Sequence, residues 1–390
     1  MRKFLLFILL SLSSVTIAHA QTPVPVASLM DIKFMMDTTA VDISMQDFDV
    51  EKFGLPTTLY DPEVKMWVAH FDRTSNTDYW KVDYKDNATF RAAMRAPFTI
   101  EVFVKVEGAE EMSPIASMES GGFGLEQVNG GGNMRLWVGA DAGGYKKAGN
   151  QSIYNASSPE YHHVLYTYDG NNIKTYYDGV LSETLSVGSI VRWNEAKNVY
   201  WLAIGGDASV GDYVQGPFKG NVALIRFYDE EIDATRVTAL HDQLEARIAL
   251  TRADELNTML EETLYDICLD LLADGSSRFM DGAELLDEGW EMMVSMNLTD
   301  ADITTFLNKV NLFISSTSSE RGIKVAKQPT ASVKGNVLVV EGMENPAVSI
   351  YGLSGIVLLK ATGNNIDISK LTPGIYVAAI NGYKIKIVKR

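Results

Sequence analysis

Hydrophobic and polar residues alternate along short runs in the first half of the chain. Residues 98–106 read Phe-Thr-Ile-Glu-Val-Phe-Val-Lys-Val, and residues 173–177 read Ile-Lys-Thr-Tyr-Tyr. A period of two predicts strands that bury one face. The pair Asp178-Gly179 separates two such runs and predicts a two-residue hairpin, because a type I′ turn needs positive φ twice. We therefore expect residues 21–232 to form a β-sandwich.

The period changes after Asp233. Apolar residues then recur three or four positions apart, as in Val237, Leu240, Leu244 and Ile248, and again in Leu256, Leu260, Leu264, Ile267 and Leu271. This spacing places them on one face of a helix. We expect three or four helices over residues 233–320, forming a spacer or a small bundle, with Asp233, Asp254 and Thr299 as N-cap residues.

Strand-like runs return near the end of the chain. They cover residues 337–340, 347–351, 375–380 and 384–388, and Gly, Asn and Pro separate them. This pattern predicts a small β-sandwich over residues 321–390. The fold class predicted for the whole chain is mainly β, with a helical segment between two sandwiches.

The first 20 residues have the pattern of a secretory signal. Arg2 and Lys3 precede a short apolar run, and Ala18-His19-Ala20 fits a signal-peptidase cleavage site. The mature chain is expected to begin at Gln21 and to be secreted or placed on the cell surface. No other run approaches 18 apolar residues, so no transmembrane segment is predicted.

Charge and cysteine content exclude several classes of function. The 390 residues include 34 basic and 50 acidic ones, a net charge of -16, which argues against nucleic acid as a partner. The single cysteine, Cys268, excludes an internal disulfide framework and a Cys-based zinc site. The charge is also uneven: residues 322–390 carry a net charge of +6, and the rest of the chain carries -22.

Three blocks of the N-terminal part resemble the laminin-G-like or concanavalin A-like jelly-roll family. They are residues 161–179, which include Tyr-His-His-Val-Leu-Tyr-Thr-Tyr-Asp-Gly, residues 202–206 and residues 218–228. The resemblance implies two antiparallel sheets over one core. It also implies a binding module for carbohydrates or proteins, often with bound calcium, although bacterial members are also joined to hydrolases.

The last 60 residues resemble the C-terminal sorting domain of the Bacteroidetes type IX secretion system. The resemblance rests on residues 348–355, on Leu371-Thr372-Pro373-Gly374-Ile375-Tyr376, and on the lysine-rich close at 384–389. Gly352 departs from the pattern, because an Asp is more usual there. The resemblance implies the secretion machinery as a partner. An ordinary bacterial immunoglobulin-like domain is the alternative.

The candidate site residues belong to loops of the predicted sandwich. Asp207 and Asp212 offer two carboxylates near a strand end, the type of ligand that calcium prefers. Trp193, which we expect to be exposed, and the predicted loop residues Tyr213 and Tyr145 are candidates for stacking on a sugar ring. No catalytic residues are predicted, because the sequence from Glu231 to Val237 lacks the closing Glu of the glucanase motif Glu-x-Asp-x-x-Glu.

The sequence leaves three functions open. The first is a non-catalytic surface module that binds carbohydrate, with or without calcium. The second is an adhesin or structural surface protein that binds an extracellular protein. The third is a glycoside hydrolase of the concanavalin A-like class.

Overall fold

The computed structural model describes most of the chain after residue 23. The described residues are 24–117, 121–191, 193, 199–209, 211, 213–273, 275–320, 329–343, 345–351, 357–372, 374–380 and 383–389. They fall into two compact units. The first contains residues up to 265 together with 286–304, and the second contains residues 266–285 together with those from 305 onward. The predicted signal at residues 1–20 lies outside the described residues.

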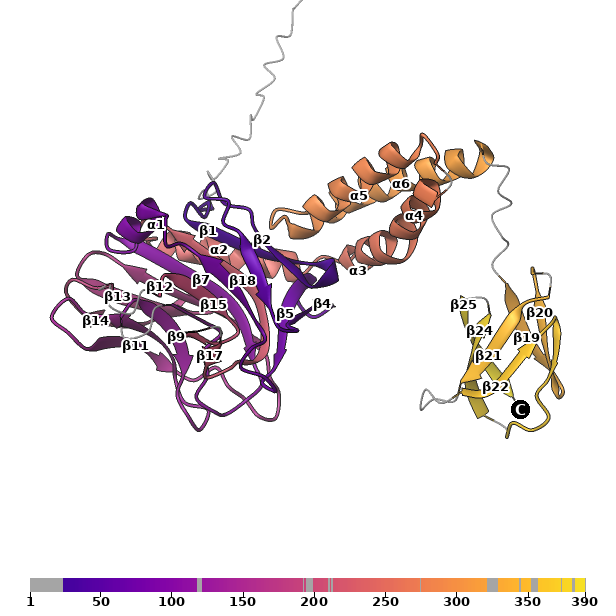
Figure 1. The fold of residues 1–390 in the computed structure, drawn as a ribbon, viewed down its shortest axis with the longest axis horizontal. Coiled ribbons are helices and arrows are strands. Elements are labelled where there is room, and N and C mark those ends of the chain that lie inside the picture. Colours follow the sequence, from indigo (N-terminus) through magenta and orange to yellow (C-terminus); the bar gives the residue numbers. More distant parts are fainter. Residues whose placement is uncertain are drawn as a thin grey trace, which may run out of the picture. The chain divides into compact units, whose positions relative to one another are not determined.

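A nine-stranded antiparallel sheet forms one layer of the first unit (Figure 1). Along its main path lie β14 (Val180–Ser186), β13 (Asn172–Tyr177), β12 (Tyr161–Tyr168), β7 (Phe98–Val106), β18 (Lys219–Tyr228), β1 (Met30–Met35) and β2 (Thr39–Asp42). Strand β5 (Met66–Asp72) also pairs with β18, and β4 (Thr57–Asp61) pairs with β5. The 3-10 turn η1 (Met36–Thr38) connects β1 to β2.

A seven-stranded sheet forms the second layer. Its order is β11 (Tyr145–Gln151), β10 (Met134–Gly139), β9 (Phe123–Gln127), β8 (Ile115–Ser117), β15 (Trp201–Ile204), β6 (Tyr79–Asp83) and β3 (Val50–Phe53). The short strands β16 (Asp207–Ala208) and β17 (Val214–Gln215) form a separate pair, and helix α1 (Ala88–Ala93) follows β6.

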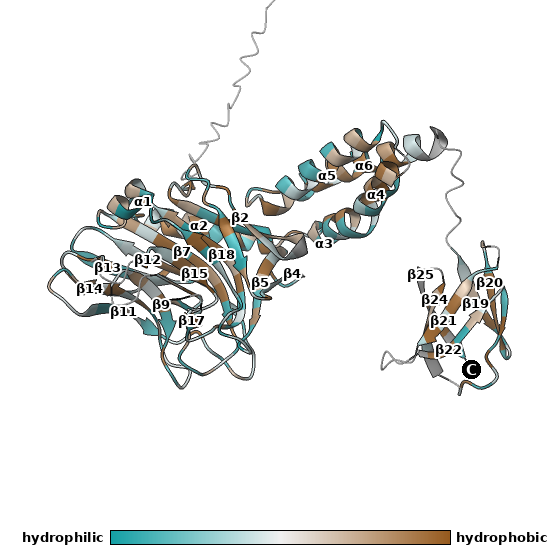
Figure 2. Cartoon of the chain, viewed as in Figure 1, coloured by the Kyte–Doolittle hydropathy of each residue, from teal (hydrophilic) through white to brown (hydrophobic). Residues whose placement is uncertain are grey.

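The two sheets enclose one apolar core, as expected from the alternation of apolar and polar residues along the strands. Ile100, Val102 and Val104 of β7 contribute to it from one sheet, and Phe123 and Leu125 of β9 contribute from the other. Hydrophobic residues recur along the strands that line this core (brown in Figure 2), with polar residues such as Thr, Glu and Lys between them in β7. The expected jelly-roll-like sandwich is confirmed.

The predicted hairpin at Asp178-Gly179 is present. Tyr177 of β13 pairs directly with Val180 of β14, so the loop contains two residues. Asp178 has φ +49° and Gly179 has φ +77°, as a type I′ turn requires.

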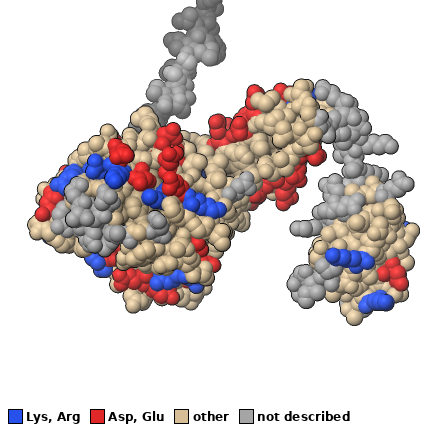
Figure 3. All heavy atoms as spheres, viewed as in Figure 1, with Lys and Arg blue, Asp and Glu red and all other residues tan. Residues whose placement is uncertain are grey.

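Helices follow the sandwich, as the change of period predicts. They are α2 (Ala234–Ile248), α3 (Ala253–Thr258), the π-helical turn η2 (Met259–Leu264), α4 (Tyr265–Ala273), α5 (Phe279–Val294) and α6 (Asp300–Glu320). Acidic side chains are prominent over this helical segment (Figure 3). None of the helices in the described part of the chain is long and apolar enough to cross a membrane.

Two of the three predicted N-caps are confirmed. The Asp233 side chain accepts a hydrogen bond from the backbone N–H of Arg236, and the Thr299 hydroxyl accepts one from that of Asp302. The prediction for Asp254 is wrong, because α3 begins at Ala253. Asp254 lies in the first helical turn, where its carboxylate accepts hydrogen bonds from Tyr60 and Lys65.

Helix α2 packs on the outer face of the nine-stranded sheet. Leu244 joins a cluster with Val68, Phe103 and Leu224, and Val237 and Leu240 join another. The second cluster contains Ala27, Leu165, Tyr176, Tyr228 and Ile232. Helix α2 therefore covers the part of this face that these clusters occupy.

The C-terminal residues of the second unit form two small sheets. One contains β19 (Thr330–Lys334), β20 (Val337–Glu341) and β23 (Asn365–Asp367), and the other contains β22 (Val357–Thr362), β21 (Ala347–Tyr351), β24 (Gly374–Ile380) and β25 (Tyr383–Lys389). They share one core, which includes Leu338, Val348, Ile366, Tyr376, Ala378 and Ile387. The predicted small β-sandwich is confirmed.

Candidate functional site

An aromatic and charged patch lies on the outer face of the seven-stranded sheet. We call it the Tyr145 patch and define it by Glu126, Arg135, Trp137, Tyr145 and Lys147. The register pairs Arg135 with Glu126, Trp137 with Lys147, and Gly139 with Tyr145. Because side chains alternate along a strand, these residues point away from the core that their neighbours Leu125, Leu136 and Ala148 enter.

Gly124 leaves room for the indole ring of Trp137. A Cβ atom at Gly124, the cross-strand partner of Trp137, would lie 2.5 Å from Trp137 Cζ2. The absence of a side chain there lets the indole lie across β9, where it is only 6% exposed. The ring of Tyr145 stands at 84° to it, with the centroids 5.4 Å apart, and Tyr145 is 45% exposed. The patch therefore presents a supported aromatic ring to solvent.

Charged groups lie on the same face of the sheet as this ring. Glu126 Oε1 accepts hydrogen bonds from Arg135 Nε at 2.6 Å and from Lys147 Nζ at 2.8 Å. Glu126 is nearly buried, whereas Arg135 and Lys147 remain partly exposed. The carboxylate holds two cationic donors in place, so that they can also bind hydroxyl or carboxylate oxygens of a ligand.

The other predicted ligand contacts lie elsewhere. Trp193 is half-buried rather than exposed, because its ring packs near Tyr84, Phe123 and Tyr200 and its Nε1 donates to the carbonyl of Arg91. Tyr213 is 40% exposed in the turn between β16 and β17, as expected for a loop. Tyr145 begins strand β11 and is therefore not in a loop.

The predicted calcium ligands are only partly described. Asp207 lies in β16 and is half-buried, and Asp212 lies outside the described residues. Among the residues that the structure describes, no group of three or more His, Cys, Asp or Glu side chains is arranged to hold a metal ion. Calcium binding by Asp207 and Asp212 stays a prediction.

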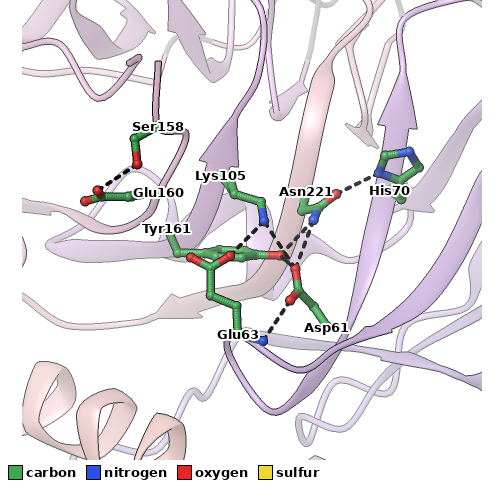
Figure 4. Close-up of polar contacts among 8 residues, drawn as sticks. All are labelled: Asp61, Glu63, His70, Lys105, Ser158, Glu160, Tyr161 and Asn221. Carbon is green, nitrogen blue, oxygen red and sulfur yellow. Dashed lines mark hydrogen bonds and ion pairs between the residues drawn. The ribbon is translucent and has the colours of Figure 1, made fainter. Parts of the chain in front are cut away.

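A second polar cluster, which the sequence pattern did not predict, lies on the outer face of the nine-stranded sheet. We call it the Asp61 cluster; it contains Asp61, Glu63, His70, Lys105, Tyr161 and Asn221 (Figure 4). Register brings four of these residues together across β5, β18, β7 and β12. His70 pairs with Asn221, Asn221 with Lys105, and Lys105 with Tyr161.

Asp61 is the centre of this cluster. Its Oδ2 accepts hydrogen bonds from Tyr161 Oη at 2.7 Å, Asn221 Nδ2 at 3.2 Å and Lys105 Nζ at 3.4 Å. Burial raises the pKa of Asp61. The hydrogen bonds from Tyr161 and the Glu63 backbone, together with the charge of Lys105, outweigh burial and hold that pKa below its usual range.

The glucanase-like residues at the end of the sandwich have structural partners. The carboxylate of Glu231 pairs with Lys174 Nζ at 2.5 Å, and the carboxylate of Asp233 caps α2. Both carboxylates therefore take part in contacts that support the fold.

Comparison with protein families supports the jelly-roll resemblance for part of the chain. Residues 70–238 match the family described as the concanavalin A-like lectin/glucanases superfamily. This range includes β7, β12, β13 and β18 and all strands of the seven-stranded sheet except β3. None of the curated proteins compared with the chain matches it.

Several solved structures are similar to the chain at low identity. The receptor-binding domain of botulinum neurotoxin C/D mosaic serotype has 12% identity and a TM-score of 0.43, covering 55% of this chain and 51% of that one. The binding domain of Paraclostridial Mosquitocidal Protein 1 has 12% identity and a TM-score of 0.44, covering 55% and 52%. The match therefore spans about half the length of these structures.

Proposed function

We propose that this chain is a secreted or cell-surface binding protein that carries out no catalysis, and that its jelly roll binds carbohydrate at the Tyr145 patch. The observation that carries the proposal is the exposed ring of Tyr145, which packs against Trp137 with the ring centroids 5.4 Å apart, on a sheet face that also carries Arg135 and Lys147. The family that residues 70–238 match includes lectins by its description.

The chemistry of the patch suits a sugar. An aromatic face packs against the C–H groups of a pyranose ring, and cationic donors form hydrogen bonds to its hydroxyl groups. Trp137 fixes the Tyr145 ring before binding, which lowers the entropy lost on association. Calcium at Asp207 and Asp212 would further support carbohydrate binding. Addition of a chelator to the binding assay tests whether binding depends on calcium.

A glycan array probed with residues 21–320, followed by calorimetry on the best ligand, tests the proposal. We expect Tyr145→Ala to weaken binding at least about tenfold, because the stacking platform is removed. Tyr145→Phe keeps the ring and should bind within a few-fold of the wild type. Tyr213→Ala removes a similarly exposed tyrosine outside the patch and is the matched control. Equal binding by Tyr145→Ala and the wild type would contradict the assignment of the site.

Exposed apolar side chains favour protein binding as the second candidate function. Val41, Ile43 and Met45 are 40%, 52% and 88% exposed along β2 and the residues after it. Apolar side chains at a sheet edge are typical of surfaces that receive a partner. Binding to a matrix protein that Met45→Ser weakens and Tyr145→Ala leaves unchanged would favour this function.

We further propose that residues 1–20 direct export and that residues 321–390 are a sorting domain of the type IX secretion type. The support is the signal-peptide pattern, the Leu371–Tyr376 element and the opposite net charge of the C-terminal part. The small two-sheet fold of residues 330–389 suits a sorting domain that is recognised separately from the rest of the chain.

A further inference from the structure

A lysine, an asparagine and a carboxylate converge in the Asp61 cluster, away from the Tyr145 patch. Lys105 of β7 and Asn221 of β18 are direct partners in neighbouring strands. The Lys105 ammonium and the Asn221 amide both donate to Asp61 Oδ2, at 3.4 and 3.2 Å (Figure 4). An amine and a carboxamide are thus held against the same oxygen atom.

The geometry points to an intramolecular isopeptide bond between Lys105 and Asn221, formed with Asp61 as the proton relay. The Lys105 amine attacks Cγ of Asn221, so that a Cγ–Nζ bond forms and the Cγ–Nδ2 bond breaks. Two protons pass from Nζ to the departing nitrogen through Asp61, which ends as the carboxylate it was at the start. Ammonium leaves, and no oxidant or reductant is needed.

The surroundings of the three groups suit this condensation. The side chains of Asp61 and Lys105 are 9% and 13% exposed, and Asn221 is 5% exposed, so little water reaches the reacting atoms. His70 Nδ1 lies 2.8 Å from Asn221 Oδ1. In the tautomer that carries a proton on Nδ1, His70 donates to this oxygen and polarises the carbonyl toward attack. Proximity of this kind replaces a bimolecular encounter.

The protonation states of Lys105 and Asp61 before the reaction limit the rate of bond formation. Burial lowers the pKa of Lys105, but the hydrogen bond to Glu63 and the charges of Asp61 and Glu63 outweigh burial and raise it above its usual value. The ground state is therefore the ammonium–carboxylate pair, and the proton must move to Asp61 before Nζ can attack. We expect the bond to form slowly and to form faster at alkaline pH.

The bond would join two central strands of the nine-stranded sheet. Strand β7 pairs with β12 and β18, and β18 also pairs with β1 and β5. A covalent link there would resist unfolding in a chain whose single cysteine excludes an internal disulfide.

Intact mass spectrometry of the denatured chain tests the inference directly. After incubation at alkaline pH, we expect the wild-type mass to be lower than the calculated mass by one ammonia, about 17 Da. Lys105→Arg keeps the positive charge but lacks the amine and should have its full calculated mass. Asp61→Asn, which lacks the proton relay, should also have its full mass. Lys174→Arg is the matched control on strand β13 of the same sheet and should retain the loss.

Peptide mapping locates the bond without relying on any variant. A digest of the denatured wild type should contain one cross-linked species that joins the peptides of Lys105 and Asn221. Cyclisation of an N-terminal Gln21 also releases ammonia, so only a loss that Lys105→Arg abolishes supports the bond. A wild-type chain at its full mass, or the same loss in Lys105→Arg as in the wild type, overturns the inference. Either result leaves the carbohydrate proposal untouched.

Discussion

His163 Nε2 lies 2.9 Å from Glu101 Oε1, and both side chains are completely excluded from solvent. The pair lies on the outer face of the nine-stranded sheet, beneath α2. His241 of that helix stacks on His163, with the ring centroids 5.6 Å apart. Glu101 also pairs with Arg226 at 3.7 Å and accepts a hydrogen bond from Tyr228. The interface between sheet and helix therefore contains a buried charged network as well as apolar clusters.

The first prediction is that Glu101 makes the stability of the protein acid-sensitive. Burial raises the pKa of Glu101, but the charge of Arg226 and the hydrogen bond from His163 outweigh burial and lower it from 4.5 to about 2. A carboxyl group with a lowered pKa stabilises the fold fully above its unfolded pKa. The contribution is then lost as the pH falls from about 4.5 toward 2.

Urea unfolding at a series of pH values measures this effect. We expect the free energy of unfolding to fall between about pH 4.5 and 2, where Glu101 is ionised in the folded state but protonated in the unfolded chain. Glu101→Gln should lower the free energy of unfolding at neutral pH by about 3 kcal/mol, since the buried Arg226 loses one of its two carboxylate partners and keeps only Asp31. The variant should also show a shallower acid dependence. The same slope in both proteins would contradict the prediction.

The second prediction concerns the close approach of two backbones at Gly220. This residue has φ +134°, and a Cβ atom there would lie 2.0 Å from the carbonyl oxygen of Lys105. Gly220→Ala should therefore destabilise the sandwich by about 3 kcal/mol or more, because β18 must move away from β7. Gly170→Ala is the control, since φ is +100° there but a Cβ atom meets nothing within 4 Å. We expect roughly 1 kcal/mol from the control, measured by thermal unfolding.

Local patterns in the sequence predicted the features that depend on neighbouring residues. The Asp178-Gly179 turn and the Asp233 cap are both decided within four residues, and the structure confirms both. The Asp254 cap failed because the same carboxylate meets Tyr60 and Lys65, which are distant in sequence. The π-helical turn η2 was not predicted, because Leu260 and Leu264 keep the apolar spacing of an ordinary helix.

The site residues depend on register, which the sequence does not state. Tyr145 was predicted as a candidate contact, but its support by Trp137 follows from the pairing of β10 with β11. The Asp61 cluster could not be predicted because five separate strands and one turn supply it. A polar residue inside an apolar strand, such as Lys105, was the available signal. Trp193 was expected in solvent because its partners Tyr84 and Phe123 are far along the chain.

The third prediction is that Lys389 anchors the last strand of the C-terminal sandwich. Its ammonium donates to the backbone carbonyls of Ile368, Ser369 and Leu371, at 2.8, 3.2 and 2.6 Å, and the residue is only 6% exposed. Lys389→Met keeps most of the apolar stem but leaves these carbonyls without their donor. We expect a local destabilisation of about 2 kcal/mol.

Hydrogen exchange read by mass spectrometry resolves this effect. Amides of β23 and β25 should exchange faster in Lys389→Met, while those of the first unit should be unchanged. Lys360→Met, at an exposed position of β22, is the matched control and should exchange as the wild type does. Unchanged protection of β25 in Lys389→Met would show that the three hydrogen bonds contribute little.

The fourth prediction tests the proposed sorting role of the C-terminal residues. Strand β24 pairs with β21 on one side and β25 on the other, so deleting residues 374–390 removes a central strand and an edge strand. The deletion also removes Tyr376, Ala378, Ile380 and Ile387 from the small core, and the remainder should not fold. In a Bacteroidetes host, the truncated chain should accumulate in the periplasm, while the full chain reaches the surface or the medium. Fractionation with an antibody against the jelly roll measures this, and Lys360→Met controls for a change that leaves the fold intact. Surface delivery of the truncated chain would refute the sorting role, because the secretion machinery would have no folded sorting domain to recognise.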